Sequence, residues 1–205
     1  MKRFGLWLIF TGLALGVIFL SAGCQNLVSE YKYKGNTLDP AKPISDFELM
    51  AANGQPFRFS ELEGDIALVF FGYTSCPDVC PLTLAAVRSV LDDLRAGRER
   101  VRVIFISTDP ERDTPEVLSK YLAAFDLEFI GLTDDFAKVQ AVMKPFGAFA
   151  EKDKATGSQA DYLVSHTALL YLVDLKKREI VSFYPFNFEP EDLKMDLTHL
   201  LRKYS

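Results

Sequence analysis

Apolar residues gather in two continuous runs in the middle of the chain, at residues 66–73 (IALVFFGY) and 101–107 (VRVIFIS). Short continuous runs of this kind are typical of strands that are buried on both faces of a sheet. Between the two runs, apolar residues recur at steps of three and four, which predicts a helix from Pro77 to about Arg95, ended by Gly97. A strand, a helix and a strand in this order predict a parallel pair joined by a crossover helix.

Further elements are predicted on both sides of this central unit. Asn53-Gly54 is a tight-turn signal between short strands at 46–50 and 56–59, so a hairpin opens the domain. The pattern after the second apolar run predicts a helix at 114–125, a strand at 128–132 and a helix from 134 or 135 to 147. A polar loop at 152–161 follows. The chain then ends in a hairpin of strands 167–174 and 180–186 and a helix at 189–203. We therefore expect an α/β fold of three layers, an α/β/α sandwich with an N-terminal hairpin and a C-terminal hairpin plus helix, which is typical of thioredoxin-like proteins.

The first 23 residues have the pattern of a targeting segment. Lys2 and Arg3 precede an uncharged, largely apolar run at 4–20, and Ser21-Ala22-Gly23-Cys24 follows. This resembles a bacterial lipoprotein signal, with cleavage before Cys24 and acylation of its thiol. Ser21 stands where Leu is usual, and the run is close to the minimum length of a membrane span, so an uncleaved anchor is the alternative.

Both interpretations of this segment place the domain outside the cytoplasm, anchored to the outer face of the bacterial cell membrane. There, disulfides are permitted and no reducing thiol pool competes for metals. Residues 24–43 are polar and contain Pro40 and Pro43, which predicts a tether; a partly ordered N-terminal arm is the alternative. We expect the folded domain to span residues 44–205.

Composition narrows the class of protein further. The 205 residues are 49% hydrophobic and include 17 Phe, enough for one domain with a sizeable core. The formal net charge is −5, and no basic stripe is present. Because phosphate contacts need clustered Lys and Arg, we expect no binding to nucleic acid.

Candidate chemistry is concentrated where the first apolar run meets the first helix, in FFGYTSCPDVCP at residues 70–81. Cys76 is expected just before the helix, and Cys80 about one turn inside it. The unpaired amides of a helix N-terminus stabilise a thiolate, the form that attacks disulfides and ligates metals. At this spacing two sulfurs can face the same side, while Pro77 and Pro81 stiffen the turn.

His166 immediately precedes the last predicted hairpin, in LVSHTALLYLVD. In a thioredoxin-like sheet this point lies beside the first strand–helix junction, so an imidazole and two thiolates would converge. Soft thiolates with one imidazole favour Cu(I), which accepts low coordination numbers. Zinc would want a fourth ligand, which Asp78 could supply, so zinc stays open.

Three stretches together resemble one known family: GYTSCPDVCP at 72–81, STDPERDTPEVLSKY at 107–121 and SHTALLYLVD at 165–174. The chain resembles the Sco/SenC family of copper proteins involved in cytochrome oxidase assembly. The resemblance implies that Cys76, Cys80 and His166 bind one copper per chain, as Cu(I) or Cu(II). It also implies delivery of copper to the binuclear copper site of cytochrome c oxidase subunit II, or reduction of the cysteines there.

Alternatives to a copper metallochaperone remain at this stage. Cys76 and Cys80 could be a redox-active pair that forms a disulfide in a thiol–disulfide oxidoreductase, or a purely structural disulfide. A peroxidase resembling the peroxiredoxins is a weaker alternative, because Thr74 stands two residues before the cysteine and not three. Three charged residues after the second apolar run could contact a partner, tune the metal electrostatically or only cap a helix in a solvated turn: Asp109, Arg112 and Asp113. Asp78 could contact a partner or only face water.

Overall fold

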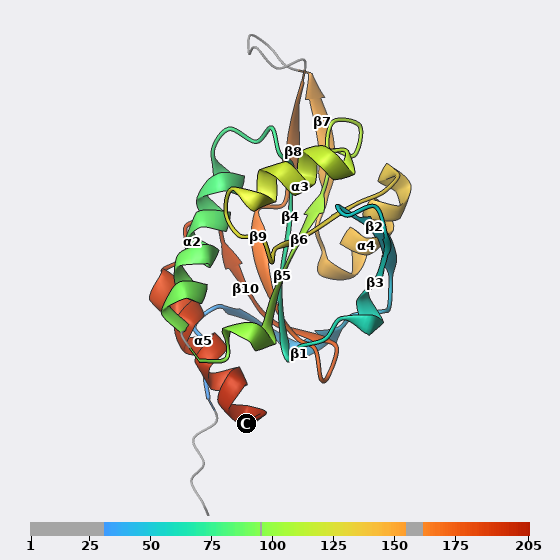
Figure 1. Cartoon of the computed structure of the whole chain (residues 1–205). Coiled ribbons are helices and arrows are strands. Elements are labelled where there is room, and N and C mark those ends of the chain that lie inside the picture. Colours follow the sequence, from blue (N-terminus) through green and yellow to red (C-terminus); the bar gives the residue numbers. More distant parts are fainter. Residues whose placement is uncertain (1–30, 95, 155–161) are drawn as a thin grey trace, which may run out of the picture. The chain divides into compact units, whose positions relative to one another are not determined.

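The structure is a computed structural model that describes residues 31–94, 96–154 and 162–205. Residues 33–205 form one compact unit. Its centre is three parallel strands: β4 (Ile66–Gly72), β5 (Val101–Ser107) and β6 (Ile130–Thr133) (Figure 1). The two continuous apolar runs thus form the two strands that the sequence predicts.

Antiparallel strands extend this centre on both sides into an eight-stranded sheet with the order β1-β10-β9-β4-β5-β6-β2-β3. The added strands are β1 (Asn36–Pro43), β2 (Glu48–Ala51), β3 (Pro56–Arg58), β9 (Leu169–Asp174) and β10 (Glu179–Pro185). The predicted hairpins are both present, β2 with β3 and β9 with β10. Strand β9 pairs antiparallel with β4, with Leu170 opposite Phe70, so the segment just before β9 lies beside the end of β4 that leads to the cysteines.

Helices cover both faces of the sheet. They are α2 (Val79–Leu94), α3 (Pro115–Ala123), α4 (Phe136–Phe146) and α5 (Pro190–Lys203), with short 3₁₀ turns η1 (Phe59–Glu61) and η2 (Arg98–Arg100). Residues of α2, α3 and α5 share one buried cluster, while those of α4 belong to the other. The fold is therefore the expected three-layer, thioredoxin-like α/β/α sandwich.

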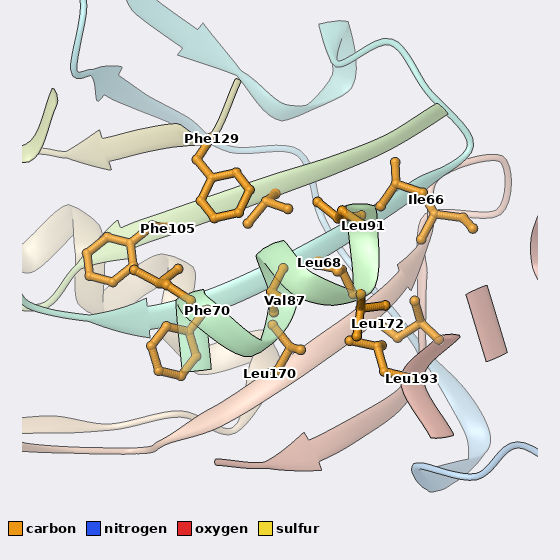
Figure 2. Close-up of a cluster of buried hydrophobic side chains, with 14 of the residues drawn as sticks. Ile66, Leu68, Phe70, Val87, Leu91, Phe105, Phe129, Leu170, Leu172 and Leu193 are labelled. Carbon is orange, nitrogen blue, oxygen red and sulfur yellow. The ribbon is translucent and has the colours of Figure 1, made fainter. Parts of the chain in front are cut away.

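Strand β4 shows why a continuous apolar run is needed. Ile66, Leu68 and Phe70 face α2 and α5, where they meet Val87 and Leu193 (Figure 2). The intervening residues of β4 face the cluster that contains α4. Every residue of β4 is buried, so both faces of the strand contribute to the core, by about 2 kcal/mol for each large side chain.

The domain begins earlier than the sequence predicts. Residues 36–43 were expected in the tether, but they form β1, which pairs with the C-terminal strand β10. Just before β1, the carboxylate of Asp196 accepts hydrogen bonds from the backbone amides of Lys34 and Gly35. An edge strand is held mainly by its backbone, so β1 lacks the apolar pattern that would reveal it.

A second difference lies in the polar segment predicted as a loop at 152–161. Two strands, β7 (Ala150–Lys154) and β8 (Tyr162–His166), pair antiparallel in a separate small sheet. Residues 155–161 lie outside the described part of the chain, as do the predicted signal at 1–23 and Cys24. Among the residues that the structure describes, no helix is both long and apolar enough to cross a membrane.

Candidate metal centre

Both cysteines lie where β4 passes into α2. Cys76 is partly exposed in the loop, and Cys80 is fully buried in the first turn of the helix. Gly72, the last residue of β4, allows this packing: a Cβ atom there would lie 2.8 Å from Cys80 Sγ and 2.9 Å from a ring carbon of Phe105. The sulfur of Cys80 is therefore seated directly against the backbone of β4.

The two thiols differ in their affinity for protons. A hydrogen bond from Cys80 is the main factor that lowers the pKa of Cys76 from 9.0 to about 3, and His166 and the backbone amides of Asp78 and Cys80 act in the same direction. The same thiol–thiol hydrogen bond, together with burial, raises the pKa of Cys80. Of the two sulfurs, Cys76 is therefore the one that loses its proton more readily and Cys80 the one that keeps it more tightly.

His166 is the last residue of β8, and its imidazole faces the thiols. Its Nε2 lies 3.6 Å from Cys80 Sγ, and its ring stands edge-on to Tyr73 and Phe70. Its Nδ1 lies 3.3 Å from the carbonyl oxygen of Thr167. With a metal in the site, a proton on Nδ1 donated to that carbonyl would leave the Nε2 lone pair free to bind the ion.

Cys76, Cys80 and His166 each place one ligand atom within 4.8 Å of the others, so together they could hold a metal ion. The arrangement joins the two halves of the site that the sequence predicts. Two sulfurs and one nitrogen at such separations suit a soft ion of low coordination number. Asp78 is exposed and lies outside this cluster, so a tetrahedral zinc ion would need its fourth ligand from elsewhere.

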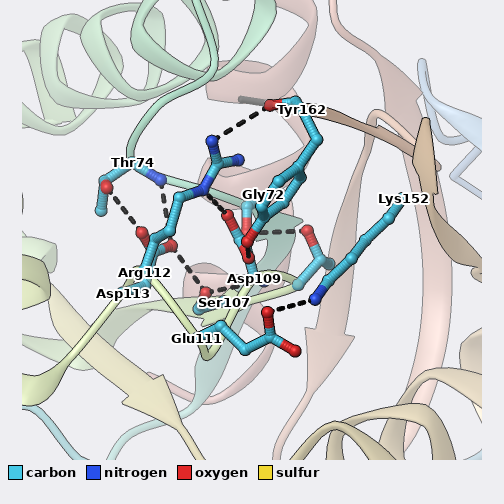
Figure 3. Close-up of polar contacts among 10 residues, drawn as sticks. Gly72, Thr74, Ser107, Asp109, Glu111, Arg112, Asp113, Lys152 and Tyr162 are labelled. Carbon is cyan, nitrogen blue, oxygen red and sulfur yellow. Dashed lines mark hydrogen bonds and ion pairs between the residues drawn. The ribbon is translucent and has the colours of Figure 1, made fainter. Parts of the chain in front are cut away.

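Asp113 is fully buried behind the cysteine loop. Its carboxylate accepts hydrogen bonds from the backbone amide of Thr74 at 3.0 Å, the hydroxyl of Thr74 at 2.6 Å and the hydroxyl of Ser107 at 2.6 Å (Figure 3). Burial is the main factor, and it raises the pKa of Asp113. The carboxylate ties the end of β5 to the segment two residues before Cys76.

Asp109, also fully buried, forms a second polar cluster next to the first. It pairs with the guanidinium of Arg112 and accepts a hydrogen bond of 2.7 Å from the hydroxyl of Tyr162, the first residue of β8 (Figure 3). The guanidinium of Arg112 donates to the carbonyl of Tyr162 at 3.0 Å and stacks 3.8 Å from the centre of its ring.

These contacts correct the prediction that Asp109 and Asp113 form a partner-contacting surface. Both carboxyls are fully buried and engaged within the domain, so they cannot meet a partner as the protein stands. Partner contact by Asp78, which is exposed, and by Arg112, which is partly exposed, stays a prediction. Gly72 and Tyr162 were not predicted as part of the site; a glycine inside a buried strand is a signal of close approach, whereas nothing in the sequence marks Tyr162.

The fold and the site define a thioredoxin-like protein with a dithiol–imidazole centre at the first strand–helix junction. The sequence profile described as SCO1/SenC matches residues 35–202. The chain belongs to the SCO1/SenC family, which confirms the resemblance seen in its three motifs. A SCO2-like protein of Rickettsia felis is 36% identical over 146 residues, which are 71% of each chain.

Solved structures agree with this assignment. The apo Sco1 protein of Thermus thermophilus superposes with a TM-score of 0.73 and 37% identity, covering 84% of this chain and 99% of that one. ScoI of Bradyrhizobium japonicum, solved with copper bound, gives a TM-score of 0.68 and 39% identity, covering 77% of this chain and 99% of that one. Members of this family thus bind copper on the same fold.

Proposed function

We propose that this protein is an extracytoplasmic copper metallochaperone that binds one copper ion through Cys76, Cys80 and His166. Its recipient would be the binuclear copper site of cytochrome c oxidase subunit II. The observation that carries the proposal is the convergence of two sulfurs and one imidazole within 4.8 Å of one another. Family membership and the copper-bound structure of a relative support it.

The three ligands differ in exposure, and this suggests how cargo would pass. Cys80 is fully buried, whereas Cys76 and His166 are partly exposed. A recipient thiolate would approach from the side of Cys76 and His166, and it would replace those ligands before the buried sulfur releases the ion. Cys76, already a thiolate, needs no deprotonation before it binds copper.

Copper titration of the full chain in detergent tests the proposal, with Cys24→Ser present so that only the two site thiols remain. The chain has two histidines, which supplies a matched control. His166→Ala should lose copper or bind it at least about tenfold more weakly, because one ligand of three is gone. His199→Ala, which changes the histidine that stands edge-on to Tyr33, should bind like the parent. Copper binding that is unaffected by His166→Ala would remove the metallochaperone proposal.

A second candidate function is thiol–disulfide exchange, favoured by the asymmetry of the two thiols. Cys76 is partly exposed with a strongly lowered pKa, whereas Cys80 is buried and protonated. The Cys76 thiolate would attack a partner disulfide and release one partner thiolate. Cys80 would then pass its proton to that released thiolate, attack Cys76 as a thiolate and release the second partner thiolate. The partner gains two electrons, and Cys76–Cys80 becomes a disulfide.

An oxidised peptide carrying the copper-site cysteines of the oxidase subunit distinguishes the two functions. Exchange predicts that Cys80→Ser accumulates a mixed disulfide through Cys76 and that His166→Ala keeps reducing the peptide. Metallochaperone function predicts copper transfer to the reduced peptide, abolished by His166→Ala. Full biological function of His166→Ala in cells would favour exchange over copper transfer.

The location of the protein is part of the proposal. We expect the acylated Cys24 to anchor the domain to the outer face of the cell membrane. Incorporation of a labelled fatty acid that disappears in Cys24→Ser would support the lipid anchor. Membrane retention of Cys24→Ser without any label would support an uncleaved apolar anchor.

A further inference from the structure

One loop contacts both halves of the metal centre. The loop starts at Ser107, the last residue of β5, and ends at Asp113. Figure 3 shows its side chains directed at two different segments of the chain. One segment leads into Cys76, and the other is the strand β8 that ends at His166. The loop is thus the place where the thiol half and the imidazole half are tied to a common support.

The thiol half is held by Asp113, through its three hydrogen bonds to Thr74 and Ser107. The imidazole half is held by Asp109, Arg112 and Tyr162, which we call the clasp. In the clasp, the carboxylate of Asp109 accepts a hydrogen bond from the hydroxyl of Tyr162. The guanidinium of Arg112 forms an ion pair with Asp109 and donates a hydrogen bond to the backbone carbonyl of Tyr162.

The clasp matters because of how the β7–β8 hairpin is attached. The hairpin forms its own two-stranded sheet and takes no part in the eight-stranded one, so no main-sheet ladder fixes its direction. At the base of the hairpin, the backbone N–H of Thr167 donates a hydrogen bond to the backbone carbonyl of Phe149. Beyond the base, side chains hold the hairpin: the clasp, an ion pair of 2.5 Å between Lys152 and Glu111, and the hydrogen bond of Tyr73 with the backbone of Val164. Val164 and Ala150 are also buried in the core cluster that contains α4.

We infer that the clasp is the positioning element of the centre: Asp109 and Arg112, acting through Tyr162, set the distance between the His166 imidazole and the two thiols. The inference rests on the proposed copper function and names residues that regulate its ligand geometry. Tyr162 stands at the opposite end of β8 from His166, so a strand held at Tyr162 and at Thr167 directs the imidazole at Cys80. With the clasp broken, the hairpin samples positions in which the ring is out of ligand range.

Tyr162→Phe is the variant of choice, because it removes one hydroxyl and keeps the ring that stacks on Arg112. Tyr204→Phe is the matched control. Tyr204 follows α5, and its hydroxyl also donates a hydrogen bond to a buried carboxylate, that of Asp174. Arg112→Lys is a second test, because it keeps the charge and removes the planar group that pairs with Asp109 and stacks on Tyr162. Each variant is made in the full chain with Cys24→Ser.

Copper(II) titration with EPR measures the position of the imidazole. Removing one such hydrogen bond shifts a local equilibrium by up to about tenfold, and the apparent affinity falls with the fraction of closed protein. We expect Tyr162→Phe and Arg112→Lys to bind Cu(II) about threefold to tenfold more weakly, with reduced nitrogen hyperfine coupling. Tyr204→Phe should keep both the affinity and the coupling. Parental affinity and coupling in Tyr162→Phe and Arg112→Lys would overturn the inference.

A measurement without metal separates this inference from the copper proposal. Hydrogen–deuterium exchange should quicken at the amides of β7 and β8 in Tyr162→Phe and not in Tyr204→Phe, because only the first loosens the hairpin. If the parent protein binds no copper, the proposed function fails while quickened exchange still supports the clasp. Unchanged hairpin exchange in Tyr162→Phe would overturn the clasp whatever the outcome with copper.

Discussion

Gly72→Ala should damage the metal centre through packing alone, without touching any ligand. The new Cβ would lie 2.8 Å from Cys80 Sγ, and 2.9 and 3.1 Å from two ring carbons of Phe105. Ordinary contacts between such atoms are about 3.5–4.0 Å, so something must move by roughly 0.7–1 Å. Neither neighbour can move easily, because Cys80 and Phe105 are both fully buried.

Overpacking of this size costs about 1–3 kcal/mol. For a chain of this length that corresponds to a fall in Tm of about 2–12 °C. The sulfur of Cys80 would also move by more than the roughly 0.5 Å that a preorganised site tolerates. We therefore expect Gly72→Ala to bind copper about tenfold more weakly, measured by titration alongside thermal melting of the metal-free protein.

Gly131→Ala is the matched control for this prediction. Gly131 pairs with Phe105 in the same sheet, and its Cβ would meet Leu122 at 2.7 Å and Leu118 at 2.8 Å, away from the sulfurs. It should lower Tm in the same range and leave copper affinity unchanged. A Gly72→Ala protein that melts and binds copper like the parent would refute the packing argument. An equal loss of copper affinity in both variants would show that general destabilisation, and not the sulfur's displacement, is responsible.

Three further predictions follow from charges and buried polar groups. The rate at which Cys76 reacts with iodoacetamide should stay constant down to roughly pH 4, because its pKa is lowered from 9.0 to about 3, while Cys80 should stay unreactive. Mass spectrometry of the labelled peptides measures both rates. A Cys76 rate that falls as the pH drops below roughly 8 would contradict this prediction. Asp113→Ala should cost about 2–4 kcal/mol in urea unfolding, because three donors lose their buried acceptor, and a cost under 1 kcal/mol would refute that role. Tyr171→Phe should leave stability unchanged or raise it by up to about 1 kcal/mol, because the hydroxyl of Tyr171 is buried with no partner among the described residues; a loss above 1 kcal/mol in the same assay would count against it.

The parts of the fold that the sequence predicts are those with strong apolar patterning. Strands β4 and β5 are continuous apolar runs because both faces are buried, and the helices predicted to start at 114 and at 134 or 135 begin directly after the caps Thr114 and Asp135. Strand β1 and the β7–β8 hairpin were not predicted. Strands β1 and β7 are polar segments held by backbone ladders, and β8 (YLVSH) is too short to show a periodicity of its own.

The same distinction holds within the site. The two cysteines were predictable because a short motif at a strand–helix junction has its own chemistry, and His166 became predictable through the family motifs. The burial of Asp109 and Asp113 was not predictable, because charged residues in a turn are usually solvated. Thr74, the partner of Asp113, lies 39 residues away in the sequence, and Tyr162, the partner of Asp109, lies 53 residues away. Only the folded chain brings these residues together.

The separation of 86 positions between Cys80 and His166 also orders events while the chain is being made. At about 5–20 residues per second, the dithiol leaves the ribosome roughly 4–17 s before the imidazole. Strand β9, the central neighbour of β4, emerges later still, so during this interval β4 has a free edge and the thiols have no third ligand. A nascent chain that met copper in this interval could offer it only sulfur, and complete coordination is a property of the finished fold.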